Sequence, residues 1–327
     1  MSIATVSKHI NGIPVKEANR VRIDAAIAEL GYQVNAAARA LKTRRSMTVG
    51  ILLDSLSNLF YTSVISEIEE LLMGEGYTAI LFETKDSLER AKQGLELFSA
   101  KSVDGVFYFS SHCLPEVLSE CRRLEIPAVV VDSILPDYPD VDFVMTENAQ
   151  AAFSAVQSLM EKGHRKIAVI TGSEIHFSAN ERLRGYYNAL HSRDIPIREE
   201  WVLRDDYNLD GGFRCVKRLL KAPDRPTALL ICNYFMAMGA VMALNEENVR
   251  VPEELSIISF DEIAWAKAVK PRLTTVNQQA GLIAGQAVRL LLARIRREKQ
   301  EGQAVLVPTC QVERESVLPI HEKGAQV

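Results

Sequence analysis

The stretch Thr48-Val49-Gly50-Ile51-Leu52-Leu53-Asp54 is a short aliphatic run that ends in a carboxylate. A run of this kind, followed by a helical pattern, is typical of a strand buried on both faces of a parallel sheet. Similar runs recur along the chain, and amphipathic stretches lie between them. The expected strands are Thr48–Leu53, Thr78–Phe82, Gly105–Phe109, Ala128–Val131, Lys166–Ile170, Ala228–Ile231, Ser256–Phe260 and Leu273–Val276. The expected helices are Val64–Met73, Leu88–Ala100, Ala149–Lys162, Arg182–Ser192, Gly211–Leu220 and Ile283–Arg297.

This alternation of strands and helices predicts an α/β fold with parallel sheets. The strands are too many for one compact sheet of ordinary size, so we expect two lobes. A chain of 327 residues is long enough for two or three domains. The run Leu273–Val276 follows a proline and is expected to carry the chain back toward the first lobe.

Ligands of open parallel sheets bind beyond the carboxyl ends of the strands. Aromatic, carboxylate, amide and guanidinium side chains follow the expected strands here, and this mixture suits a polyhydroxylated ligand. The residues at these ends are Asp54, Ser57, Asn58, Phe60, Tyr61, Ser110, Ser111, Asp132, Ser133, Ser173, His176, Ser178, Asn180, Arg182, Asn233, Tyr234, Asp261 and Trp265.

Several of these residues have a structural alternative. Asp54 and Asp132 could cap the helices that follow them, and Phe60 and Tyr61 could belong to the core. Arg182 could be a surface arginine at the start of a helix. Asp261 follows a very apolar strand, where a carboxylate needs a partner, and this favours a functional placement.

The first 45 residues have the pattern of a DNA-binding head. Ser2–Ser7 begins a helix with small polar side chains that can meet base edges, Lys16–Leu30 forms a second helix, and Asn35–Leu41 a third. Residues 1–50 hold eight Lys and Arg against three acidic residues, whereas the rest of the chain holds 30 basic and 39 acidic residues. A basic head on an acidic body indicates that only the head meets a polyanion.

A helix-turn-helix needs a first helix that braces the second against the DNA backbone. The chain begins at Met1, directly before the expected recognition helix. We therefore expect this 327-residue chain to have a truncated head that lacks the first helix, folds poorly and binds DNA weakly.

Other function classes find little support. The five cysteines are scattered and form no C-x-x-C pair, so we expect reduced thiols, no metal site and a cytoplasmic protein. No stretch has 18 uninterrupted apolar residues, and no secretion pattern follows Met1, so we expect no membrane association. Phosphate-loop, dinucleotide, zinc-protease and nucleophile-elbow motifs are absent, which makes an enzyme the weaker hypothesis, and no cofactor is expected.

A series of motifs stands in a fixed order along the chain. They include T-V-S-x-x-x-N within Ser2–Asn11, E-L-G-Y within Ile27–Asn35, V-D-G at Val103–Gly105, G-H-R-K-I-A at Gly163–Ala168, R-L-x-G-[FY] at Arg182–Tyr186, P-T-A to A-x-G-A at Pro226–Ala240, V-P-E-x-x-S to F-D at Val249–Asp261, P-x-L-T-T-V at Pro271–Gln279 and R-E-S at Arg314–Ser316. Together they resemble the LacI/GalR family of bacterial transcription regulators across essentially the whole chain.

The resemblance implies two Rossmann-like lobes of the periplasmic-binding-protein type I, joined by three crossovers and preceded by a helix-turn-helix head and a hinge helix. The implied division is 1–46 for the head, 47–146 plus 279–305 for the first lobe, 147–277 plus 306–320 for the second lobe, and 321–327 for a tail. It also implies a homodimer that binds a pseudopalindromic operator and a small-molecule effector, here expected to be a sugar or glycoside.

The strand ends and the resemblance together define the candidate residues. The expected effector-binding residues are Phe60, Tyr61, Ser110, Asp132, His176, Ser178, Arg182, Tyr207, Asn233, Tyr234, Asp261 and Trp265. The expected DNA-binding residues are Ile3, Ala4, Thr5, Ser7 and Lys8 in the recognition helix, and Asn35, Ala38, Arg39 and Leu41 at the hinge helix.

One departure from the family pattern concerns the ligand. Tyr234 replaces the acidic residue usual after Asn233, and an extra ring there would favour stacking on a larger saccharide. The leading hypothesis is an effector-controlled regulator, usually a repressor, located with the nucleoid in the cytoplasm. The alternatives are a sugar-binding module without effective DNA binding and an α/β enzyme.

Overall fold

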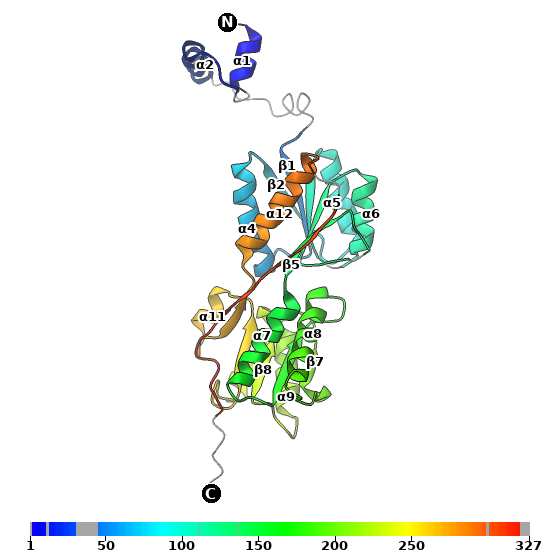
Figure 1. Cartoon of the computed structure of the whole chain (residues 1–327), viewed down its shortest axis with the longest axis vertical. Coiled ribbons are helices and arrows are strands. Elements are labelled where there is room, and N and C mark those ends of the chain that lie inside the picture. Colours follow the sequence, from blue (N-terminus) through cyan, green and yellow to red (C-terminus); the bar gives the residue numbers. More distant parts are fainter. Residues whose placement is uncertain are drawn as a thin grey trace.

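The computed structural model describes residues 2–10, 13–30, 45–110, 112–135, 137–298 and 301–320. It shows two α/β lobes stacked along the long axis of the molecule, with two helices beyond the first lobe (Figure 1). These helices are α1 (Ile3–Ile10) and α2 (Glu17–Leu30), as expected for the head, and the His9 ring contacts the Asp24 carboxylate between them at 2.5 Å. The expected third helix, Asn35–Leu41, lies outside the described residues.

The first lobe is built on a sheet of six parallel strands in the described part of the chain. Its strand order is β11-β5-β4-β3-β1-β2. The register aligns Leu53 with Phe109, and Phe109 with Val131, so these three strands end at one edge. The strands are β1 (Thr48–Leu53), β2 (Thr78–Glu83), β3 (Gly105–Phe109), β4 (Ala128–Val131), β5 (Asp142–Thr146) and β11 (Ala304–Val307).

The second lobe has a sheet of the same organisation, in the order β12-β10-β9-β8-β6-β7. All its described pairings are parallel except that of β12 with β10. The strands are β6 (Ile167–Thr171), β7 (Val202–Arg204), β8 (Ala228–Ile231), β9 (Ser256–Phe260), β10 (Thr274–Asn277) and β12 (Cys310–Val312). The α/β fold with two lobes is therefore confirmed.

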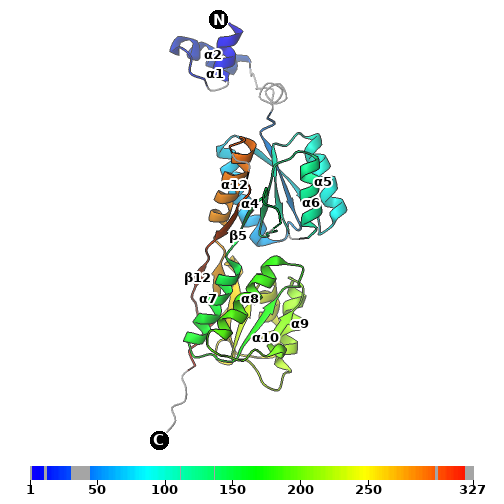
Figure 2. The same ribbon diagram turned by 45° about the vertical axis from the view of Figure 1, so that its right-hand side comes forward.

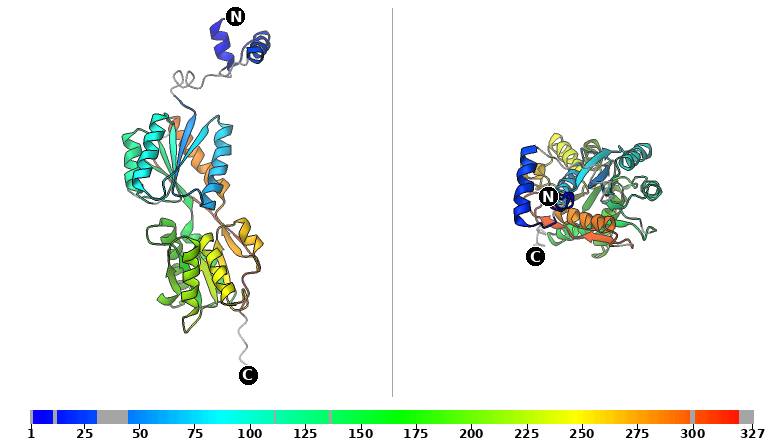
Figure 3. Two further views of the ribbon diagram at one scale, coloured as in Figure 1. Left: turned by 180° about the vertical axis from the view of Figure 1, so that it is seen from behind. Right: turned by 90° about the horizontal axis from the view of Figure 1, so that it is seen from above.

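Helices cover both faces of each sheet (Figures 1 and 2). In the first lobe α4 (Leu59–Gly74) and α12 (Ala280–Ile295) pack on one face, and α5 (Leu88–Ala100) and α6 (Leu114–Arg123) on the other. In the second lobe α7 (Asn148–Glu161) and α8 (Phe177–His191) lie opposite α9 (Leu209–Leu220) and α10 (Tyr234–Glu246). Short α11 (Ala264–Ala268) completes the second lobe, which Figure 3 shows from behind. Each lobe thus has two apolar layers, one on each side of its sheet.

Three crossovers connect the lobes in the described chain. They run from β5 to α7, from β10 to α12, and from β11 to β12. Strand β11 pairs with β5 along its whole length, so the first lobe extends to Val307 rather than to residue 305 as expected.

The sequence did not predict β5, β7, β11, β12, α6, α10 or α11. Strand β5 begins with Asp142, a charged residue that is fully buried because Arg294 of α12 pairs with it at 2.5 Å. Helix α10 packs against α9 and the sheet, so apolar residues occur around most of its circumference and no amphipathic period is visible. Helices α4 and α8 begin earlier than expected, at Leu59 and Phe177.

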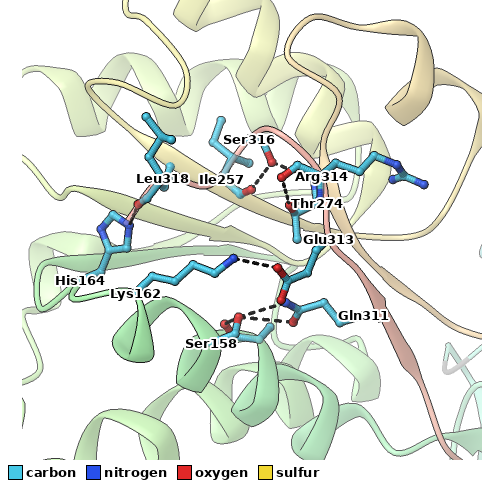
Figure 4. A network of polar contacts seen from close by, with 12 residues as sticks. Ser158, Lys162, His164, Ile257, Thr274, Gln311, Glu313, Arg314, Ser316 and Leu318 are labelled. Carbon is cyan, nitrogen blue, oxygen red and sulfur yellow. Dashed lines mark hydrogen bonds and ion pairs between the residues drawn. The ribbon is translucent and has the colours of Figure 1, made fainter. Parts of the chain in front are cut away.

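The C-terminal segment, residues 310–320, is fixed to the second lobe by buried polar contacts (Figure 4). The Ser316 hydroxyl donates to the Ile257 carbonyl at 2.6 Å and accepts from the Thr274 amide at 2.7 Å. The Arg314 guanidinium donates to the Glu262 carboxylate, and the His164 ring contacts the Leu318 carbonyl at 3.0 Å. These contacts fix the C-terminal segment to the amino ends of β9 and β10.

We expect Ser316→Ala to lower the free energy of unfolding by about 1–3 kcal/mol, because the amide of Thr274 and the carbonyl of Ile257 would stay buried without this partner. Urea unfolding of the two proteins measures this difference. The matched control is Ser119→Ala, whose hydroxyl is exposed and donates to the Pro115 carbonyl. Equal losses in both variants would contradict the proposed role of Ser316.

Candidate ligand-binding site

A cavity of about 380 Å³ lies where the carboxyl ends of the two sheets face each other. Side chains from both lobes and from one crossover line it. They are Asp54, Ser55, Asn58, Phe60, Tyr61, Asp86, His112 and Asp132 from the first lobe, Ile175, His176, Ser178, Arg182, Asp206, Tyr207, Asn208, Asn233, Phe235 and Asp261 from the second, and Gln278 from the crossover. The volume is in the range of small-molecule sites.

Two aspartates occupy equivalent positions in the two lobes. Asp132 follows β4 and Asp261 follows β9, and both have positive φ angles, 65° and 75°. Each backbone amide donates to the neighbouring strand, Asp132 to the Val144 carbonyl and Asp261 to the Val276 carbonyl, both at 2.9 Å. Positive φ is uncommon for residues other than glycine, and such conformations cluster at functional sites.

Arg182 is the buried cation of the cavity, with 3% of its surface exposed. Its Nε donates to Asn148 Oδ1 at 2.7 Å, and Nη1 donates to the Cys232 carbonyl. The guanidinium lies 4.0 Å from the centre of the Phe260 ring. The alternative that Arg182 is a surface residue is therefore wrong, because it lies in the second turn of α8 and faces inward.

Asp261 is held by groups from two elements. Gln278 Nε2 donates to Asp261 Oδ1, and the Tyr234 amide donates to Oδ2 at 3.2 Å. Gln278 in turn accepts from the Thr146 hydroxyl at 2.9 Å. Because Thr146 ends β5 and Gln278 follows β10, this chain of bonds connects the cavity to two of the crossovers.

Asparagines cap helices that begin at the cavity, among them α4 and α10. Asn58 Oδ1 accepts from the amides of Phe60 and Tyr61 at the start of α4, and Asn233 Oδ1 accepts from the amide of Phe235 at the start of α10. Asn58 and not Asp54 is therefore the cap of α4. No helix starts at Asp132, which is followed by a loop and β5, so the capping alternative is wrong there too.

Aromatic rings form two walls of the cavity. Tyr61 is buried against Phe109, and its hydroxyl donates to Asp132 Oδ2 at 3.3 Å. Tyr61 is thus a core residue through its ring and a site residue through its hydroxyl. The His176 and Tyr207 rings stack at 5.1 Å, and a Cβ at Gly172 would meet the Tyr207 ring at 2.6 Å, so the stack requires glycine there.

The carboxyl groups of the cavity are poorly neutralised. Burial raises the pKa of Asp54 to about 7, with a further contribution from Asp86. Burial also raises the pKa of Asp132, to about 6, although Arg182 acts in the opposite direction. The pKa of Asp261 is raised by burial, and that of His176 is lowered by burial.

Most of the expected effector-binding residues line this cavity, and Ser110, Tyr234 and Trp265 do not. Ser110 is buried, and its hydroxyl accepts from the His112 amide at 3.0 Å. Trp265 packs in the apolar layer beneath α9 and α10. Tyr234 bridges the lobes instead of stacking on a ligand: its hydroxyl accepts from the Leu59 amide at 2.8 Å and donates to the Ser57 carbonyl at 3.3 Å.

The sequence missed several lining residues. Asp86 follows the end of β2, and the rule of strand ends applied to that strand would have found it. Asp206 and Asn208 follow β7, a strand that was not predicted. Phe235 lies one residue after the tyrosine chosen in its place, and no local pattern distinguishes the two. Ser55, His112, Ile175 and Gln278 were also missed.

Comparison with known proteins agrees with this geometry. A family model described as a periplasmic binding protein-like domain matches residues 156–317. Catabolite control protein A of Priestia megaterium is 32% identical over 310 residues, which are 94% of this chain and 93% of that protein.

The chain belongs to the LacI/GalR family of transcription regulators.

Two solved structures extend the likeness of this LacI/GalR regulator to the whole chain. The lac repressor dimer bound to operator and the anti-inducer ONPF superposes with a TM-score of 0.84 at 26% identity, covering 97% of this chain and 96% of that one. The complex of the transcriptional regulator CelR with cellobiose has a TM-score of 0.77 at 29% identity, with the same coverage.

The expected DNA-binding residues of this regulator fall in two segments. Ile3, Ala4, Thr5, Ser7 and Lys8 lie in α1, where Ala4 and Lys8 are exposed and Thr5 is half-buried. The hinge residues Asn35, Ala38, Arg39 and Leu41 lie outside the described residues.

Within the described ranges, no helix has both the length and the apolar character to cross a bilayer. Among the same residues, no three His, Cys, Asp or Glu side chains are grouped so as to hold a metal ion.

We expect Asp132→Asn to stabilise the ligand-free protein in a pH-dependent way. Between about pH 4 and pH 6 the folded state keeps a proton on Asp132 that the unfolded chain has released, so wild-type stability falls across this window. The increase in the free energy of unfolding caused by Asp132→Asn should be near zero at about pH 4 and on the order of 1–3 kcal/mol above pH 6. Thermal melting across this range measures it, with the exposed Asp137→Asn as control, and a pH-independent gain would contradict the assignment.

Tyr234→Phe removes a hydroxyl that joins the lobes and leaves the ring in its buried place. We expect the ligand-free variant to favour more open arrangements, since two hydrogen bonds across the cleft are lost. Small-angle X-ray scattering should then show a larger radius of gyration than for wild type. Tyr138→Phe is the control, because Tyr138 lies outside the cavity and stacks on Arg122. Unchanged scattering of Tyr234→Phe would show that the bridge does not hold the lobes together.

Proposed function

We propose that this protein is a repressor whose affinity for operator DNA is controlled by a carbohydrate bound between its lobes. The observation that carries the proposal is the cavity at the facing strand ends, in a chain that also has a basic helical head. The distribution of charge supports separate partners for the two parts, a polyanion for the head and a small ligand for the body.

The side chains that line the cavity support a carbohydrate as its ligand. Carboxylates such as Asp132 and Asp261 accept from adjacent hydroxyls, whereas Arg182 is placed to donate. The rings of Phe60 and Phe235 offer flat apolar faces for the C–H side of a sugar. The CelR structure contains cellobiose, and its likeness to this chain supports the same class of ligand here.

The head supports operator binding by a homodimer. Exposed Lys8 and Ala4 lie on α1, the expected recognition helix, and the related lac repressor dimer is bound to operator. Two heads of a symmetric dimer would read the halves of a pseudopalindrome, and lysine and arginine contacts to phosphates would make the affinity fall steeply with salt. We propose that the protein acts with the nucleoid in the cytoplasm.

The two-lobed body supports control by population shift. The ligand contacts both lobes, so it binds one lobe arrangement more tightly than the other, and a coupling of about 1–3 kcal/mol to DNA affinity is typical. We propose that the protein acts by this binding and not by catalysis, because its relatives are transcription regulators.

The ligand part is tested by thermal melting with a panel of saccharides and nucleobases. A true effector at ~100 times its dissociation constant stabilises the folded protein by ~2.7 kcal/mol. We expect at least one saccharide to raise the melting temperature, and Asp261→Ala to abolish that rise while the exposed Asp210→Ala retains it. A flat response to every saccharide would contradict the carbohydrate assignment.

The DNA part is tested by selecting bound sequences from a random pool at low salt. We expect enrichment of a pseudopalindrome, and an affinity for it that changes when the saccharide found above is added. Lys8→Ala should weaken binding to all sequences. Failure to enrich any sequence would leave the alternative of a binding module without effective DNA binding.

A further inference from the structure

The cavity carries far more negative than positive charge. Five aspartates line it, at positions 54, 86, 132, 206 and 261. Arg182 is the single arginine in the lining, and no lysine occurs there among the described residues. Burial lowers the pKa of His176, so this ring does not supply a compensating charge. A neutral sugar would leave this imbalance in place.

The negative charge of the cavity is less well compensated by hydrogen bonds in the first lobe than in the second. In the second lobe, Asp261 receives hydrogen bonds from Gln278 and from the Tyr234 amide, whereas Arg182 lowers the pKa of both Asp261 and Asp132. In the first lobe, Asp132 Oδ1 is buried and accepts no hydrogen bond. Its other oxygen has one long bond, 3.3 Å, from the Tyr61 hydroxyl.

Asp54 and Asp132 follow β1 and β4, the two strands that flank β3, and Asp54 is also poorly compensated. It accepts a hydrogen bond from the adjacent Ser55 amide, and no ion pair to it occurs among the described residues. The raised pKa of Asp54, about 7, reflects burial together with repulsion from Asp86 and Asp132. Buried carboxylates that repel each other in this way are stabilised by a cation placed between them.

The surroundings of the pair fit an organic cation. An ammonium group has three donors, enough for the free oxygen of Asp132 and an oxygen of Asp54. Phe60 and Tyr61 lie beside them, and aromatic faces also attract an ammonium. Among the described residues no three His, Cys, Asp or Glu side chains are grouped so as to hold a metal ion, and the aromatic rings beside the pair favour an organic cation.

We propose that the effector is an amino sugar, whose protonated amine binds Asp54 and Asp132 in the first lobe while its hydroxyls bind Arg182, Asn233 and Asp261 in the second. This inference rests on the proposed carbohydrate site and names the charge of its ligand. An amine held by one lobe and hydroxyls held by the other would draw the two lobes together.

Matched sugars test the proposal on the full chain by titration calorimetry at neutral pH. Glucosamine, galactosamine and mannosamine are each compared with the parent sugar and with the N-acetyl derivative, in which the positive charge is removed. We expect at least one amino sugar to bind tenfold or more tightly than both of its neutral counterparts, as a charge-assisted bond to a carboxylate provides.

Two variants locate the charge. Asp54→Asn and Asp132→Asn each keep the size of the side chain and remove its charge, so the preference for the amine should fall to a few-fold or less. The exposed Asp137→Asn should keep the wild-type preference. If Asp54→Asn and Asp132→Asn both retain the wild-type preference for the amine, the assignment of the amine to these two aspartates is wrong.

The outcomes separate this inference from the proposed function. If neutral sugars bind as tightly as their amines, the amino-sugar proposal is overturned and the carbohydrate site stands. If no member of any set binds, the amino-sugar proposal is overturned, and the carbohydrate site is decided by the melting response to the wider saccharide panel.

Discussion

The buried guanidinium of Arg182 is the interaction on which the site depends. A cation with 3% exposure requires partners, and it finds Asn148 at the first crossover, the Cys232 carbonyl at the end of β8 and the Phe260 ring. These contacts fix the edge of the second sheet against the segment that enters from the first lobe. The carboxylates of Asp261 and Asp132 then lie within its field, which defines the floor of the cavity.

The crossovers make the cavity responsive to the arrangement of the lobes. Thr146 and Gln278 belong to two different crossovers, and their hydrogen bond leads directly to Asp261. Tyr234 adds a bridge from the second lobe to the start of α4 in the first. The groups around Asp261 are therefore the same groups that connect the two lobes.

The two lobes share a sheet order but differ in their electrostatics. Both place an aspartate with positive φ after the fourth strand of the lobe. In the second lobe Asp261 accepts hydrogen bonds from Gln278 and the Tyr234 amide, whereas in the first lobe one buried oxygen of Asp132 accepts none. Arg182 lowers the pKa of both aspartates, so the two lobes differ in hydrogen bonding and not in their access to this cation.

The sequence by itself determined the alternating strands and helices through local periodicity, the family through its ordered motifs, and most of the cavity lining through the rule that ligands bind at strand ends. The tertiary structure alone decided that Tyr234 bridges the lobes while Phe235 lines the cavity, since a single turn of α10 presents adjacent residues in different directions. It also decided that Asp142 is a buried strand residue and that Asp206 joins the site after β7, a strand with no local signal. Those roles depend on partners distant in sequence, which no local pattern encodes.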